Sequence, residues 1–163
     1  MTIAPADAAV SLKLDSESAT VALAGRIARL AQAGDVIALR GELGSGKTTF
    51  ARGFIRALGR ADEEVPSPTF TLVEVYDFPD GAPAVWHFDL YRLGESEDVY
   101  ELGFEEALGG GILLIEWPER LGPLLPRERL DVELSAGSSA TTRGVRLAAG
   151  RVWSRRLAIL GCS

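Results

Sequence analysis

One glycine-rich segment constrains this chain more than any other feature of its sequence. Residues 41–48 read GELGSGKT, which fits the pattern G-x-x-x-x-G-K-[S/T]. The apolar run at residues 35–40 predicts a buried strand before the segment, and residues 48–58 have helical character up to Gly59. A strand, such a loop and a helix in this order are the context in which the pattern binds phosphate. The sequence therefore predicts a phosphate-binding loop within an α/β fold.

The residue types in this loop suit a nucleoside triphosphate. Glycines allow positive φ angles, so that successive backbone N–H groups can point at phosphate oxygens at the start of a helix. Lys47 is placed to reach the β- and γ-phosphates, and the Thr48 hydroxyl is placed to bind Mg²⁺. The loop positions predicted to contact the nucleotide are Gly44, Ser45, Gly46, Lys47, Thr48 and Thr49.

Length and charge limit the remaining choices. The chain has 163 residues, a formal net charge of −6 and one cysteine, Cys162. This length predicts a single domain over residues 1–163. The acidic balance makes tight, direct binding of nucleic acid a poor hypothesis. We see no signal peptide, and no apolar stretch approaches the roughly 18 residues that span a bilayer, so we expect a cytoplasmic protein.

The other segments predict a P-loop NTPase-like three-layer sandwich. We expect strands at 10–14, 70–76, 84–88, 112–115, 130–134 and 145–147, and helices from about 17 to Gly34 and over 95–106. Strands that alternate with helices favour a mainly parallel central sheet. The 70–88 hairpin and the late strands, which have no helix between them, favour antiparallel additions at its edges. Residues 118–126 read as a short helix or a loop.

Acids and hydroxyls outside the loop are candidates to complete a hydrolytic site. Asp89 and Glu116 each follow a predicted strand, and a nucleoside triphosphatase needs an acid near Mg²⁺ and a group that orients water. Spacing alone does not separate this role from that of a surface acid. Ser67 and Thr69 flank Pro68, where they either face the γ-phosphate or simply shape a turn.

The aromatic and basic residues read mainly as structural. His87 is the only histidine, and its place within a strand favours a structural residue over a general base. The three tryptophans read as packing residues. Arg151, Arg155 and Arg156 read as a solvated face, with a partner or RNA contact as the alternative.

Several motifs occur together in a recognisable order. GELGSGKTT at 41–49 is followed by SPTF at 67–70, HFDLYRL at 87–93 and IEWPE at 115–119. In these motifs the chain resembles the TsaE family, also called YjeE. That family is the bacterial P-loop ATPase associated with threonylcarbamoyladenosine at position 37 of tRNAs that read codons starting with A.

The resemblance implies roles for particular residues. Lys47 and Thr48 would serve ATP and Mg²⁺, Glu116 matches the acid for Mg²⁺, and Asp89 matches the catalytic acid. Thr69 matches the hydroxyl of a switch-like loop. Glu17 and Thr20 match positions near the nucleotide. Ser45 stands where many family members have alanine.

The resemblance also implies partners and a mode of action. TsaE proteins form a complex with the TsaD and TsaB proteins, which would hold the tRNA. They are weak ATPases whose turnover resets the modifying complex, and they do not transfer the threonylcarbamoyl group themselves.

Two other functions remain as alternatives. A small-molecule or nucleotide kinase of the P-loop class would need a lid and an acceptor pocket, for which residues 59–109 leave little room. The second alternative is a non-catalytic nucleotide sensor, in which Asp89 or Glu116 would have no catalytic role.

Overall fold

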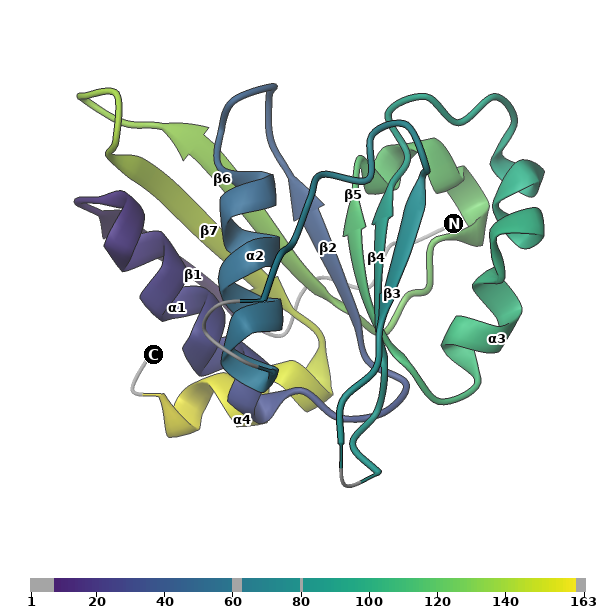
Figure 1. The fold of residues 1–163 in the computed structure, drawn as a ribbon. Helices are drawn as coiled ribbons and strands as arrows, with labels where there is room; N and C mark the ends of the chain where they lie inside the picture. Colours follow the sequence, from purple (N-terminus) through teal and green to yellow (C-terminus); the bar gives the residue numbers. More distant parts are fainter. Residues whose placement is uncertain (1–7, 60–62, 80, 161–163) are drawn as a thin grey trace.

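A single mixed sheet organises the computed structural model, which describes residues 8–59, 63–79 and 81–160 (Figure 1). The strand order is β1-β7-β6-β2-β5-β4-β3. The strands are β1 (Ala8–Leu14), β2 (Val36–Arg40), β3 (Val73–Tyr76), β4 (Val85–Asp89), β5 (Ile112–Glu116), β6 (Leu130–Ala136) and β7 (Arg143–Ala149). Cys162, and Asp80 within the predicted 70–88 hairpin, lie outside the described residues.

The direction of the strands changes from the centre of the sheet to its edges. The neighbours β6, β2, β5 and β4 run parallel. At one edge β3 pairs antiparallel with β4, as the predicted hairpin requires. At the other edge β7 pairs antiparallel with both β6 and β1. The predicted α/β class is therefore confirmed, with a parallel centre and antiparallel additions.

The late strands differ from the expected antiparallel edge in one respect. β6 pairs parallel with β2, and the antiparallel pairing begins only at β7. The cause is the connection from β5, which passes through the 3₁₀ segment η2 (Pro118–Leu124). This connection returns the chain to the opposite end of the sheet, so that β6 enters in the same direction as β2.

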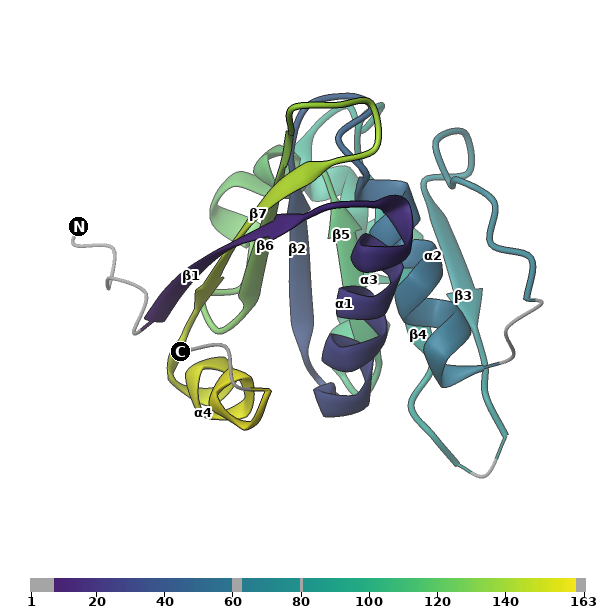
Figure 2. The same cartoon turned by 90° about the vertical axis from the view of Figure 1, so that its left-hand side faces the viewer.

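Helical segments cover both faces of the sheet (Figures 1 and 2). One face packs against α1 (Glu17–Leu30), α2 (Lys47–Leu58) and α4 (Arg151–Ile159) in the larger apolar core. The other packs against the 3₁₀ segment η1 (Ser96–Leu102), α3 (Phe104–Leu108) and η2 in a second core. These layers match the predicted three-layer sandwich. No helix among the described residues has the length and apolar character needed to cross a membrane.

Local capping and packing explain most differences from the predicted helices. α1 begins after Ser16, whose side chain accepts a hydrogen bond from the Ala19 N–H, and it ends at Leu30, before Gly34. The acidic segment expected to be an exposed helix is a 3₁₀ turn followed by a short α-helix. It buries Val99 and Phe104 against the sheet.

The C-terminal arginines lie on a helix that the sequence analysis did not predict. α4 buries Trp153 in the core, and Arg156 lies over the Trp153 ring and pairs with Asp35. Arg156 therefore has a packing role, which corrects the expectation of a wholly solvated face. The helix buries only Trp153 and Leu157, and two apolar positions are too few to predict a helix from sequence periodicity.

Candidate functional site

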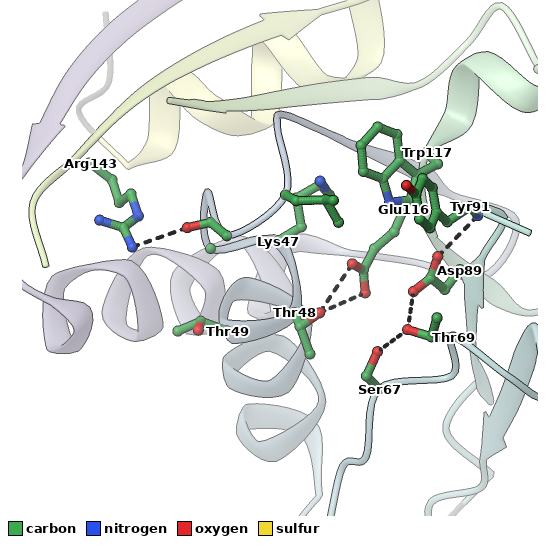
Figure 3. Close-up of a pocket in the computed structure, with 13 residues that line it drawn as sticks. Lys47, Thr48, Thr49, Ser67, Thr69, Asp89, Tyr91, Glu116, Trp117 and Arg143 are labelled. Atoms are coloured by element: carbon green, nitrogen blue, oxygen red, sulfur yellow. Dashed lines mark hydrogen bonds between the residues drawn. The ribbon is translucent and has the colours of Figure 1, made fainter. Parts of the chain in front are cut away.

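A cavity of about 310 Å³ lies at the carboxyl ends of β2, β5 and β4, where open α/β sheets bind their ligands (Figure 3). One wall comes from the glycine-rich loop at 41–49, and we call it the loop wall. The facing wall carries Asp89 and Glu116 with Thr69, and we call it the acid wall. The cavity is lined by Leu43, Gly44, Gly46, Lys47, Thr48, Thr49, Ser67, Thr69, Asp89, Tyr91, Glu116, Trp117 and Arg143.

Left-handed glycines give the loop wall its shape. Gly41, Gly44 and Gly46 have φ angles of 143°, 77° and 108°. A side chain at Gly41 would also collide, since a Cβ there would lie 2.4 Å from the Leu134 carbonyl oxygen. Gly46 caps α2 with no side-chain hydrogen bond, so the first N–H groups of α2 have no side-chain partner at the cap. A helix start of this kind is a site for an anion.

Lys47 is the first residue of α2 and lies almost buried, with 5% of its surface exposed. Its ammonium donates hydrogen bonds to the carbonyl oxygens of Gly41 and Glu42, and it lies 3.9 Å from the centre of the Trp117 ring. Burial lowers the pKa of Lys47 below its usual 10.5, and nearby acids, Glu116 first, partly oppose this change. A cation held so close to the helix start suits a phosphate.

The acid wall follows from the register of two parallel strands. Asp89 and Glu116 end β4 and β5 and are register partners. The Thr48 hydroxyl donates to both Glu116 carboxylate oxygens, at 3.1 and 3.3 Å. This bond joins the loop wall to the acid wall, and it leaves the lone pairs of the Thr48 oxygen available for a metal ion. A hydroxyl and a carboxylate are the hard oxygen ligands that Mg²⁺ prefers.

A chain of hydroxyl groups holds the second acid. The Thr69 hydroxyl donates to Asp89 Oδ2 at 2.9 Å, and the Tyr91 N–H donates to Oδ1 at 3.1 Å. Thr69 gives its one hydrogen to Asp89, so the Ser67 hydroxyl, 2.8 Å away, donates to Thr69. Asp89 is thus fixed at the cavity with oxygens that can accept a hydrogen bond from water.

Most of the predicted site residues line this cavity, but Ser45 does not, and neither do Glu17 and Thr20. Glu17 and Thr20 lie at the start of α1 and line a smaller adjacent cavity of about 40 Å³. Gly46, Thr49 and Arg143 line both cavities and connect them. Ser45 is a buried residue of the loop, and its Oγ has no hydrogen-bond partner among the described residues.

Sequence reasoning missed Arg143, Tyr91 and the full role of Trp117. Arg143 begins β7, and its guanidinium donates to the carbonyl oxygen of Ser45 at 2.8 Å. It also donates to the carbonyl oxygen of Gly44 at 3.3 Å (Figure 3). Trp117 packs against the second core, as expected of a packing residue, and it also stacks on Tyr91 at the cavity. Its position directly after Glu116 was the available signal. Nothing in the sequence linked Arg143 to the loop.

The sheet, the left-handed glycines and the cation at the helix start together define a P-loop protein of the α/β class. Comparison with known proteins then gives the family. The model of the family described as "Threonylcarbamoyl adenosine biosynthesis protein TsaE" matches residues 14–145. The chain belongs to the TsaE family, which confirms the resemblance seen in its motifs.

Individual relatives agree with this assignment. The chain is 42% identical over 123 residues to the tRNA threonylcarbamoyladenosine biosynthesis protein TsaE of Rickettsia conorii, covering 76% of this chain and 69% of that protein. It is 44% identical over 115 residues to TsaE of Bacillus subtilis, covering 69% of each. The crystal structure of YdiB from Bacillus subtilis superposes with a TM-score of 0.77 at 29% identity, covering 94% of this chain and 95% of the other.

Proposed function

We propose that this protein binds and hydrolyses ATP in a Mg²⁺-dependent reaction, and that it acts in forming threonylcarbamoyladenosine at position 37 of tRNAs that read A-starting codons. The family assignment supports the biological role. The observation that carries the chemistry is the Thr48–Glu116 hydrogen bond, which joins a phosphate-binding loop to a carboxylate at the end of a strand.

The loop wall binds the triphosphate in this proposal. Backbone N–H groups of Gly44, Ser45 and Gly46 and of the first turn of α2 surround the phosphates, where the helix dipole also favours negative charge. Lys47 exchanges the Gly41 and Glu42 carbonyls for β- and γ-phosphate oxygens. Thr49 lies by the α-phosphate. Glu17 and Thr20 approach the nucleotide through the smaller cavity.

The acid wall carries out the hydrolysis. Thr48 and Glu116 are the residues that would hold Mg²⁺, and the ion would supply positive charge that neutralises the phosphates. Asp89, oriented by Thr69 and Tyr91, accepts a hydrogen bond from the attacking water. The water oxygen bonds to the γ-phosphorus as the bond from that phosphorus to the β-bridging oxygen breaks, which yields ADP and phosphate. Asp89 or the released phosphate takes the proton.

Hydrolysis would act as a switch. Hydroxyl hydrogen bonds join residues 67–69 to Asp89, so a γ-phosphate at this point can hold the segment in one arrangement and its loss can release it. We propose TsaD and TsaB proteins as the partners that read this state and bind the tRNA. Slow intrinsic turnover follows if a partner completes the site. The net charge of −6 agrees with indirect contact to tRNA. We propose a cytoplasmic location.

Mass spectrometry of nucleosides from bulk tRNA tests the proposal in depleted cells complemented with variants. Threonylcarbamoyladenosine should fall on depletion and return with the wild type and with Lys13→Ala, which changes an exposed lysine. It should not return with Lys47→Ala. An unchanged nucleoside level on depletion contradicts the proposed role, and ADP release that depends on an added acceptor would indicate a kinase instead.

A further inference from the structure

His87 is a fully buried polar residue with no role in the hydrolysis described above. It lies in the middle of β4 and is the only histidine of the chain. Its Nε2 atom lies 2.6 Å from Glu116 Oε2. Its Nδ1 atom has no hydrogen-bond partner within the described part of the chain. The imidazole is therefore held by one polar contact, and that contact is with Glu116.

The register of the sheet explains why these side chains meet. His87 pairs with Leu114 and Asp89 pairs with Glu116 across the parallel strands β4 and β5. Side chains alternate along a strand, so His87, Asp89, Leu114 and Glu116 all point to one face of the sheet. Val85 and Leu114 contribute to the core under α1 and α2, so this is the face that α2 covers. His87 therefore lies on the same face as Glu116, two residues before Asp89 on β4. Its buried imidazole contacts Glu116 from within the core.

We propose that His87 is a positioning residue for the Mg²⁺ site, an inference that rests on the proposed function. A carboxylate only accepts hydrogen bonds, so the imidazole must donate its Nε2–H to Glu116 Oε2. With Thr48 donating from the loop wall, Glu116 is oriented from both sides. Groups that orient a ligand in this way commonly change metal affinity about 10- to 100-fold when removed.

The unpaired Nδ1 argues against a purely structural role. An apolar side chain would fill a buried strand position without leaving a nitrogen unsatisfied. Histidine here supplies one thing that an apolar residue does not, which is the donor to Glu116. The residue does not line the cavity, so it acts on the reaction only through that carboxylate.

Two variants separate the donor from the bulk of the ring. In His87→Gln the amide N–H extends far enough to replace Nε2–H, whereas in His87→Asn the shorter side chain does not reach Glu116. Binding of a fluorescent ADP analogue is measured in EDTA and over a range of Mg²⁺ concentrations, with thermal unfolding recorded for each variant. The Mg²⁺ concentration for half-maximal enhancement should rise about tenfold in His87→Asn and stay within about threefold in His87→Gln. Binding in EDTA should change little in either.

Each outcome of this titration decides the inference. The inference is overturned if nucleotide binding by the wild type and by His87→Asn depends equally on Mg²⁺. It is also overturned if His87→Asn loses as much nucleotide affinity in EDTA as in Mg²⁺, because such a loss would indicate a structural role. Wild-type protein that binds the nucleotide with no Mg²⁺ dependence overturns the proposed metal site and this inference together. If nucleotide binding by the wild type depends on Mg²⁺ and the substitution His87→Asn leaves that dependence unchanged, this inference alone is overturned.

A measurement on the wild type keeps the test independent of how the variants fold. Because the chain has one histidine, long-range ¹H–¹⁵N spectra of the untagged protein contain a single set of imidazole signals. A proton on Nε2 is the expected result. A ring with its proton on Nδ1 alone cannot donate to Glu116, and that result would overturn the inference.

Discussion

The two walls of the cavity are built in different ways. The loop wall is one continuous segment that works mainly through backbone groups, and its shape depends on glycines in the left-handed region. The acid wall combines the side chains of Thr69, Asp89 and Glu116, which come from separate segments. Thr69 donates a hydrogen bond to Asp89, and the buried His87 behind the wall contacts Glu116. Substitutions in the two walls should therefore have different effects on the protein. Changes in the loop wall should impair binding or folding, and an isosteric change at Asp89 in the acid wall should impair chemistry alone.

Asp89→Asn should produce the largest separation between the walls. The amide keeps the shape of the side chain but loses the charge that orients or deprotonates water, so kcat for ATP hydrolysis should fall about 10²- to 10⁴-fold. Nucleotide affinity should stay within about threefold, because the loop wall is intact. Phosphate release and equilibrium binding, measured on the same sample, check this. Asp15→Asn, which makes the same change at an exposed site, is the control. An equal loss of binding in Asp89→Asn would contradict the division of roles.

Lys47→Ala should weaken the binding of ATP, which Asp89→Asn should leave nearly unchanged. Removal of a hydrogen-bonded cation from the phosphates costs about 1.5–3 kcal/mol, which weakens binding of ATP about 10- to 100-fold. Isothermal titration calorimetry with a non-hydrolysable ATP analogue measures this loss, with Lys13→Ala as the control. Affinity like that of the wild type would mean that the loop does not bind the phosphates through this lysine.

A pair of glycine substitutions tests whether the loop wall depends on its backbone. Gly41→Ala adds a Cβ 2.4 Å from a backbone oxygen at a φ of 143°, which should lower the free energy of unfolding by about 3 kcal/mol. Gly44→Ala meets no atom within 4 Å, so it should cost only about 1 kcal/mol for its left-handed backbone. Urea unfolding compares them. Equal midpoints would show that the close approach at Gly41 is not needed.

Arg143→Ala should have the smallest effect of these changes. The guanidinium holds the loop from β7 through the Ser45 and Gly44 carbonyl oxygens. Because these bonds hold the loop and do not contact the phosphates, their loss should weaken nucleotide binding by only a few-fold, about 1 kcal/mol. The exposed Arg146 on the same strand provides a matched alanine control. Calorimetry on both variants measures the difference. A loss equal to that of Lys47→Ala would mean that Arg143 contacts the nucleotide directly.

The same contrast explains what the sequence could predict. The loop wall lies in one stretch, so its spacing and its glycines predicted it directly. Asp89 and Glu116 were recognisable as acids at strand ends, but their contacts depend on strand register, which no local pattern encodes. Arg143 lies 98 residues from Ser45 in the chain, and nothing local marks it. The single domain over residues 1–163 and the role of each site residue stay predictions.

A crystal structure with Mg²⁺ and a non-hydrolysable ATP analogue tests the central claim most directly. We predict the β- and γ-phosphates on the N–H groups of residues 44–48 and on Lys47, the metal ion beside Thr48 and Glu116, and Asp89 facing the γ-phosphate with a water between them. A nucleotide bound with its phosphates away from the loop wall, or with its base against Asp89, would contradict the account.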